Sequence, residues 1–161
     1  MRHLNLQALK KAILDAGHEF DLVGPEKGRI VVDKNGEVEM KIEYGIDEVK
    51  PHDYDALLIP GGYSPDKLRG DERFLDFIRH FSKKRKPIFS ICHAPQLLAS
   101  ADVLHGVDAT TVPRISVDIT NAGGKFIDEA AVYDKSGLIS GRTPDDLAQF
   151  NEAIISALGN I

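Results

Sequence analysis

One stretch, residues 86–100, constrains the fold more than any other part of the chain. Its apolar run Ile88–Ile91 predicts a short buried strand, and a tight turn follows at Cys92. We expect a helix to open at Ala94 or Pro95, because proline fits the first helical turn, where its missing N–H costs nothing. The only cysteine of the chain therefore lies at a strand-to-helix junction, which is where a nucleophile elbow presents its reactive atom.

The residues around this junction favour a reactive cysteine over a structural one. A nucleophile turn is crowded, so the positions two before and two after it must be small, and here they are Ser90 and Ala94. The helix that follows is expected to point free N–H groups at the sulfur of Cys92, which favours thiolate over thiol. His93 stands directly beside it. A buried structural role is the alternative, because free cysteine is among the most buried residue types.

Helices and strands are predicted to alternate along the chain. The apolar run 55–59 ends at Pro60-Gly61-Gly62 and is typical of a parallel strand covered on both faces. Hydrophobic periodicity and turn residues place the other elements. Helices are expected at 4–16, 71–83, 116–121 and from an N-cap at Thr143 onward; strands at 18–23, 109–112, 125–127, 130–133 and 137–140; and a hairpin at 29–33 and 37–42. The pattern predicts an α/β three-layer sandwich, with a flavodoxin-like, mostly parallel sheet, helices on both faces and a small hairpin.

The composition limits the class of protein. A chain of 161 residues with 42% hydrophobic and 28% charged residues suits one domain, 1–161. Its formal net charge of -5 argues against a nucleic-acid partner, and no apolar run is long enough to span a membrane. One cysteine fits a reducing cytoplasm. The six histidines lack metal-ligand spacing and no dinucleotide loop is present, so we expect neither a metal nor a cofactor.

Taken together, these motifs resemble the PfpI family, the intracellular-protease and deglycase branch of the class I glutamine amidotransferase-like fold. Bacterial general stress proteins are among the similar members. The resemblance covers nearly the whole chain from Leu6 to Leu158. It is carried by residues 54–69, 86–98, 121–124 and 141–147.

The resemblance implies a role for each site residue. Cys92 matches the nucleophile and His93 the histidine that follows it. Gly61 and Gly62 match a loop whose backbone amide, with that of His93, forms an oxyanion hole, although a simple strand-ending turn is the alternative. Asp66 matches an acidic position that, in hexameric relatives, reaches the histidine of a neighbouring subunit. A helix-start role is equally open for Asp66. The family also implies a homodimer or a homohexamer.

The sequence departs from the family in three places. Relatives begin with a strand and a short acidic loop whose glutamate lies beside the nucleophilic sulfur, and no residue here matches that glutamate. Either the natural protein starts further upstream, or the sheet lacks a central strand and leaves its neighbours unpaired. Ala94 stands where relatives usually carry glycine, and Val112 where many carry an aromatic residue.

Three functions follow from the resemblance. The first is a cofactor-independent cysteine hydrolase or lyase with glyoxalase-like or deglycase-like action on small reactive carbonyl compounds, in which Cys92 attacks the carbonyl and His93 moves the proton. The second is peptide-bond hydrolysis by the same groups. The third is a redox-sensing stress protein without turnover, in which Cys92 is oxidised.

Overall fold

The structure of the protein is a computed structural model, which describes residues 6–32, 39–60 and 68–159. Its α-helices are α1 (Leu6–Asp15), α3 (Glu72–Lys83), α4 (Pro95–Ser100), α5 (Ser116–Asn121) and α6 (Leu147–Leu158). Its strands are β1 (Val23–Gly24), β2 (Ile30–Val32), β3 (Glu39–Lys41), β4 (Tyr44–Gly45), β5 (Leu57–Ile59), β6 (Ile88–Ile91), β7 (Asp108–Ala109), β8 (Lys125–Phe126), β9 (Ala131–Tyr133) and β10 (Leu138–Gly141). Short 3₁₀ turns lie at Ile46–Glu48, Pro51–Asp53, Pro113–Ile115 and Pro144–Asp146.

The main sheet has the strand order β5-β6-β10-β9. Its first two pairings are parallel and the last is antiparallel, which confirms the predicted α/β class with a mostly parallel sheet. Strands β2 and β3 form the predicted antiparallel hairpin, whose turn lies outside the described residues. Two further parallel pairs, β1 with β4 and β7 with β8, form separate small sheets. In the described part of the chain, β5 is therefore an edge of the main sheet, and β1 does not join it.

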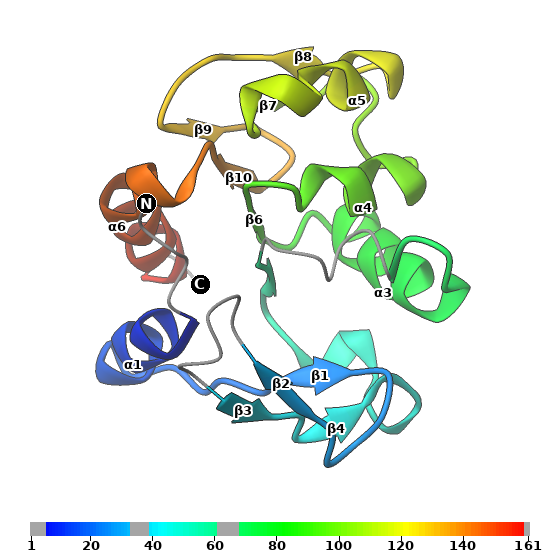
Figure 1. The fold of residues 1–161 in the computed structure, drawn as a ribbon, viewed down its shortest axis with the longest axis vertical. Coiled ribbons are helices and arrows are strands. Elements are labelled where there is room, and N and C mark those ends of the chain that lie inside the picture. Colours follow the sequence, from blue (N-terminus) through cyan, green and yellow to red (C-terminus); the bar gives the residue numbers. More distant parts are fainter. Residues whose placement is uncertain (1–5, 33–38, 61–67, 160–161) are drawn as a thin grey trace.

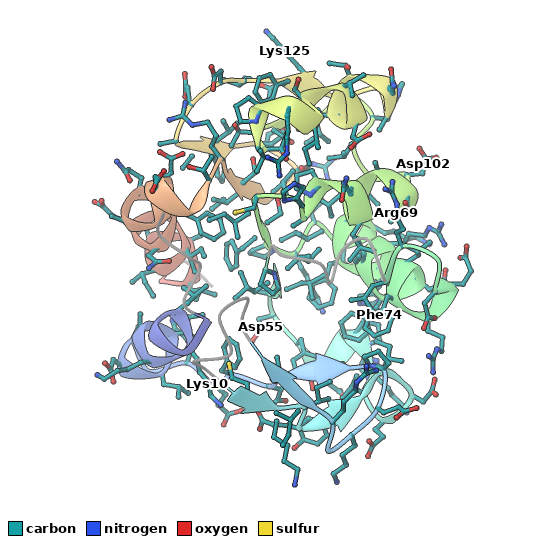
Figure 2. All side chains as sticks on the ribbon, in the orientation of Figure 1. Lys10, Asp55, Arg69, Phe74, Asp102 and Lys125 are labelled. Atoms are coloured by element: carbon teal, nitrogen blue, oxygen red, sulfur yellow. The ribbon has the colours of Figure 1, made fainter. Side chains whose placement is uncertain are left out.

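Helices cover both faces of the main sheet, as the sequence predicts (Figure 1). Side chains of β6 alternate between the two faces. Ile88 joins the core formed with α3, α4 and α5. Phe89 and Ile91 join the second core, formed with α1 and α6. Figure 2 shows apolar side chains filling both layers, while exposed groups such as Asp102 and Lys125 point away from them.

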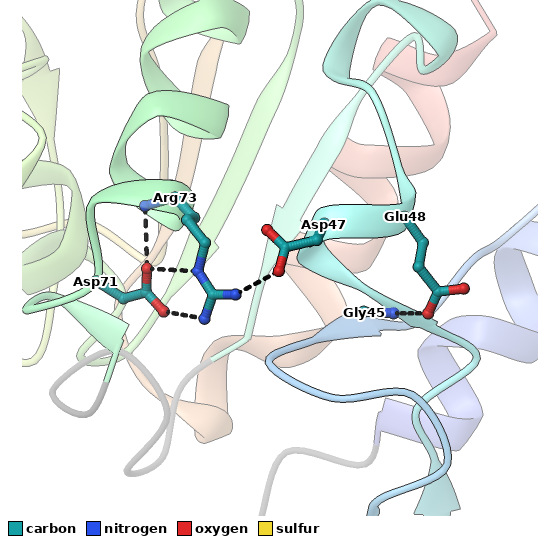
Figure 3. Close-up of polar contacts among 5 residues, drawn as sticks. All are labelled: Gly45, Asp47, Glu48, Asp71 and Arg73. Atoms are coloured by element: carbon teal, nitrogen blue, oxygen red, sulfur yellow. Dashed lines mark hydrogen bonds and ion pairs between the residues drawn. The ribbon is translucent and has the colours of Figure 1, made fainter.

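Helix α3 begins where the sequence predicts, and an ion pair joins its first turn to the 3₁₀ turn at Ile46–Glu48. The Asp71 carboxylate caps the helix by accepting from the backbone N–H of Arg73 at 3.0 Å. The Arg73 guanidinium also lies 2.7 Å from both Asp71 and Asp47 (Figure 3). Because the Arg73 side chain is 46% exposed, this bridge orients the 3₁₀ turn at Ile46–Glu48 more than it stabilises the fold.

Two predicted strands are shorter in the structure, because other groups take their backbone hydrogen bonds. The strand expected at 18–23 is reduced to β1, and the N–H of Leu22 donates to the side chain of Glu43 at 3.1 Å instead. The strand expected at 109–112 ends at Ala109 within β7. Beyond it, the N–H of Thr110 donates to the Ser140 hydroxyl at 2.9 Å.

The last helix also begins later than predicted. Thr143 is not its N-cap: the Thr143 carbonyl accepts from the N–H of Asp146 at 2.9 Å and opens a 3₁₀ turn. Helix α6 starts after that turn, at Leu147. Its buried face includes Phe150 and Ile154, as the spacing predicts. No helix in the described ranges is long and apolar enough to cross a membrane.

Gly141, the last residue of β10, is closely surrounded by core side chains. A Cβ at this position would lie 2.8 Å from the Phe150 ring and 3.2 Å from Ile91. We expect Gly141→Ala to lower the free energy of unfolding by about 1–3 kcal/mol, because a packed interior does not yield to an added methyl group. Urea titration followed by circular dichroism measures the change.

Gly70 supplies the matched control for this prediction. Among the described residues, no atom lies within 4 Å of a Cβ built there, so Gly70→Ala should change stability by less than about 0.5 kcal/mol. Combining Gly141→Ala with Phe150→Leu should cost less than the sum of the two single changes, since the smaller side chain makes room. Equal losses at Gly70 and Gly141 would contradict the packing explanation.

Candidate active site

Cys92 adopts a backbone conformation that side chains rarely tolerate. It directly follows β6, and its φ is +58°, in the left-handed region that costs a non-glycine residue about 1–2 kcal/mol. Its side chain is largely buried, with 6% of the residue exposed. The two flanking positions that the sequence predicts to be small, Ser90 and Ala94, are both fully buried. The strand, the tight turn and the following helix are thus present at the expected residues.

The surrounding chain holds this conformation through the backbone of Cys92. Its N–H donates to the carbonyl of Gly141 at 3.2 Å. Its carbonyl accepts from the Thr111 hydroxyl and from the N–H of Val112, the latter at 3.4 Å. Both polar backbone groups of Cys92 are therefore engaged by two different segments. Strain of this kind persists only where the surroundings determine it, which is typical of functional sites.

Helix α4 differs from the expectation for its first turn. Ala94 precedes the helix with φ −54° and ψ −33°, a right-handed conformation in which alanine in place of glycine causes no strain. The N–H of Ala94 donates to Ile91, and that of Gln96 donates to His93, at 3.1 and 3.0 Å. Since Pro95 has no N–H, the predicted row of free amides facing the sulfur is wrong for these residues. The amides of Ala94 and Gln96 instead donate to carbonyl groups of the turn itself.

His93 is half-buried and lies against Arg114. Its Nε2 is 3.3 Å from a terminal nitrogen of the Arg114 guanidinium. A guanidinium can only donate, so Nε2 is the acceptor in this contact. Arg114 comes from the 3₁₀ turn at Pro113–Ile115. The structure therefore places a permanent positive charge beside the histidine that follows the candidate nucleophile.

A layer of buried hydroxyl groups lies at the carboxyl ends of β6 and β10. Ser90 is paired in register with Ser140, whose hydroxyl accepts from the N–H of Thr110. All three residues are fully buried. Among the described residues, the hydroxyls of Ser90 and Thr110 have no hydrogen-bond partner. The elbow thus lies above a polar interior rather than a purely apolar one.

Some predicted site residues cannot be placed. Gly61, Gly62 and Asp66 lie outside the described residues, so their assignments to the oxyanion hole and to a neighbouring histidine stay predictions. Cys92 and His93 are adjacent at the turn, as their sequence positions require. Within the described residues, no group of three or more histidine, cysteine or acidic side chains is arranged to hold a metal.

Arg142, in another of the motifs, has a structural partner. Its guanidinium donates to both carboxylate oxygens of Asp146, at 2.9 and 3.2 Å, and to Asp128 at 3.0 Å. These bonds hold the pKa of the Asp146 carboxyl below its ordinary value. The bond pattern ties the end of β10 to the start of α6, and it does not involve Cys92.

Sequence reasoning missed two residues that contact the elbow, Thr111 and Arg114. Neither belongs to a recognisable pattern, because each approaches Cys92 or His93 from about twenty positions away in the chain. The one signal was the unusual stretch that begins at Val112, where the sequence departs from the family.

Comparison with known proteins identifies relatives of this site. The model of the DJ-1/PfpI family matches residues 1–157. The chain is 50% identical over 144 residues to Escherichia coli (strain K12) protein/nucleic acid deglycase 2, covering 89% of this chain and 84% of that protein. It is 45% identical over 148 residues to general stress protein 18 of Bacillus subtilis (strain 168), covering 92% and 86% of the two chains.

A solved structure has the same fold. It is a two-domain protein from Anabaena variabilis that contains DJ-1/ThiJ/PfpI-like and ferritin-like domains. The two folds superpose with a TM-score of 0.90 at 35% sequence identity. The match covers 94% of this chain but only 43% of that protein, so it concerns less than half of the two-domain chain.

Two adjacent threonines test how the elbow is held. The Thr111 hydroxyl donates to the Cys92 carbonyl, whereas that of Thr110 has no partner among the described residues, and both side chains are fully buried. We expect Thr111→Val to lower the free energy of unfolding by about 1–2 kcal/mol, because it removes a buried hydrogen bond. Thr110→Val should be neutral or stabilising. Chemical denaturation measures both, and the reverse order would refute this picture of the turn.

Acid titration tests the contact between Arg142 and Asp146. Arg142 lowers the pKa of the Asp146 carboxyl from 3.8, so the ionised form stabilises the folded state at neutral pH. That stabilisation is lost as the pH falls through the lowered pKa. Asp146→Asn should therefore reduce the loss of stability between about pH 4 and pH 2, measured by urea titration at each pH.

The neighbouring carboxylate provides the control for this titration. Asp145 is exposed and makes no ion pair within the part of the chain that the structure describes. Asp145→Asn should keep the acid-dependent slope of the unmodified protein. A slope that changes equally in both variants would show that the contact with Arg142 has no special role.

Proposed function

This chain belongs to the DJ-1/PfpI family, and on that premise we propose that it is a cysteine-dependent enzyme with deglycase-like or glyoxalase-like action on reactive carbonyl compounds. The name of the 50% identical Escherichia coli relative, protein/nucleic acid deglycase 2, supports this chemistry. General stress protein 18, the Bacillus subtilis relative, supports a role in stress. The proposed substrates are small carbonyl compounds or their adducts.

One observation carries the proposal. The only cysteine of the chain occupies the strained turn at the carboxyl end of a parallel strand, with both of its polar backbone groups held by other segments. Ligands of α/β proteins bind at this edge of the sheet. Arg85 and Asp102 also have a positive φ, but each follows the end of a helix. Cys92 differs from them because its turn joins a buried parallel strand to a helix, the position at which a nucleophile elbow exposes its reactive atom.

The proposed reaction begins at the sulfur of Cys92. The thiolate forms a bond to the carbonyl carbon, and the electron pair of the C=O bond moves to oxygen. The backbone amides of His93 and Gly62 are proposed to stabilise that oxyanion. With methylglyoxal, proton transfer between the two carbons gives a thioester, and water releases lactate and restores the thiol. The overall reaction adds one water to methylglyoxal.

His93 is proposed to move the protons in this sequence. In its contact with Arg114, Nε2 of His93 is the acceptor. When Nε2 exchanges the Arg114 donor for the substrate's proton, it can take up that proton and later return it, as a general base that then acts as an acid must do. Asp66 is proposed to orient the histidine of a neighbouring subunit, an arrangement that needs a homodimer or a homohexamer.

Turnover of methylglyoxal tests the proposal. We expect Cys92→Ala to reduce lactate formation, followed by proton NMR, by at least about 100-fold, because the residue that bonds the substrate is removed. His93→Asn should reduce it by about 10- to 100-fold, as expected for loss of a general base. Tyr133→Phe, on the exposed outer strand β9, is the control and should retain full activity.

The alternative functions give different results in the same set of proteins. Lactate formation that persists in Cys92→Ala would refute the nucleophile assignment. Cys92-dependent cleavage of an unstructured peptide without lactate formation would favour a peptidase. An oxygen adduct on Cys92 after peroxide treatment, seen by intact mass in a protein with neither activity, would favour redox sensing.

A further inference from the structure

Arg114 is held beside the elbow by the backbone that precedes it. The Cys92 carbonyl accepts from the Thr111 hydroxyl and from the N–H of Val112, which fixes this segment against the turn. The next residues form a 3₁₀ turn, in which the N–H of Ile115 donates to the carbonyl of Val112 at 3.0 Å. Arg114 thus follows an anchored segment and does not extend from a long loop.

Within residues 6–32, 39–60 and 68–159, no carboxylate neutralises the charge of Arg114. Arg73, Arg79 and Arg142 each contact carboxylates at 2.7–3.0 Å. Arg114, in contrast, makes no ion pair with any residue that the structure describes, and its guanidinium lies against the ring of His93. The nearest acidic residue along the chain, Asp118, accepts from the side chain of Gln96 at 3.5 Å.

In the part of the chain that the structure describes, several donors of the guanidinium therefore have no acceptor, next to the histidine that follows Cys92. Arginine presents five N–H groups in a planar fork, and the contact with His93 uses one nitrogen. The side chain is exposed, so an incoming ligand can reach it. Such a fork matches the two oxygens of a carboxylate, which it binds through paired hydrogen bonds. The formal net charge of the chain is -5, so attraction of an anion to this site depends on the local charge of Arg114 and not on the charge of the whole protein.

We propose that Arg114 is a specificity-determining residue, which binds an anionic group of the substrate. The Cys92 site therefore favours 1,2-dicarbonyl compounds that carry a carboxylate next to the dicarbonyl group. The inference rests on the proposed function, because it assigns a substrate class to the same site. Arg114 contacts His93, the residue next to Cys92. An anionic group bound by Arg114 therefore holds the carbonyl of the same ligand near the sulfur of Cys92. A neutral dicarbonyl lacks this second point of attachment.

A pair of alkylating reagents tests the inference without any turnover. Iodoacetate and iodoacetamide have nearly the same shape, but only iodoacetate carries a negative charge. In both reactions the thiolate displaces iodide, which leaves with its electron pair while a C–S bond forms. Because Cys92 is the only cysteine, intact mass reports the rate at this site alone. The iodoacetamide rate corrects for any change in the reactivity of the thiol.

The ratio of the iodoacetate rate to the iodoacetamide rate is the quantity that decides. We expect Arg114→Gln to lower this ratio by roughly three- to tenfold, the effect of removing one unit charge a few ångströms from the anion. Arg114→Lys should retain the charge but not the fork and give an intermediate ratio. Added salt should reduce the difference between the unmodified protein and Arg114→Gln.

The control and the contrary results are equally specific. Arg29 is exposed and precedes the hairpin strand β2, so Arg29→Gln should leave the ratio unchanged. An unchanged ratio in Arg114→Gln would overturn the inference. Equal slowing of both reagents would show that Arg114 only positions His93, and failure of either reagent to label native Cys92 would show that the site admits no such ligand.

The same experiment separates this inference from the proposed function. If the protein does not consume methylglyoxal but the alkylation ratio depends on Arg114, the anion site stands and the enzymatic proposal fails. If turnover depends on Cys92 and the ratio does not depend on Arg114, the enzymatic proposal stands and the anion site fails. For an active enzyme, Arg114→Gln should raise the inhibition constant of glyoxylate, added as a competitor that binds but is not turned over, several-fold more than it raises KM for methylglyoxal.

Discussion

The left-handed turn at Cys92 is the constraint on which the candidate site depends. A φ of +58° is unfavourable for cysteine by about 1–2 kcal/mol, so the turn exists only because other segments hold it. The Gly141 carbonyl binds its N–H, and the segment at Thr111 and Val112 binds its carbonyl. These partners come from the ends of β10 and β7. Three chain segments therefore form the elbow: the turn at Cys92, the end of β10 at Gly141, and the residues Thr111 and Val112.

The two cores explain why these segments meet. Strand β6 is buried on both faces, with Ile88 in one core and Phe89 in the other. Parallel pairing with β10 brings Gly141 level with Ile91, one residue before the turn. Gly141 must lack a side chain there, because Phe150 of α6 occupies the space that a Cβ would fill. Packing of the last helix against the sheet thus sets how closely β10 approaches the nucleophile.

Much of the fold could be predicted because its signals are local. The burial of Ile88 to Ile91, the proline at the start of α4 and the extent of α3 each depend on nearby residues. Predictions failed where a distant group competed for the backbone. Residues after β7 bind Ser140 and Cys92 rather than a strand, and no local pattern records such long-range partners. The late start of α6 has a local cause instead, the 3₁₀ turn at Pro144–Asp146.

The sequence by itself determined the family resemblance, the α/β class and the position of Cys92 and His93 at a strand-to-helix turn, because strand and helix periodicity and small flanking residues are properties of neighbouring positions. Only the tertiary structure decided which groups hold that turn and which surround it. Thr110 and Thr111 are the same residue type and equally buried, yet only Thr111 reaches the Cys92 carbonyl. Arg114 meets His93 across a separation of 21 positions. Such contacts arise from the packing of whole elements against one another, and that packing decides the charge beside the candidate nucleophile.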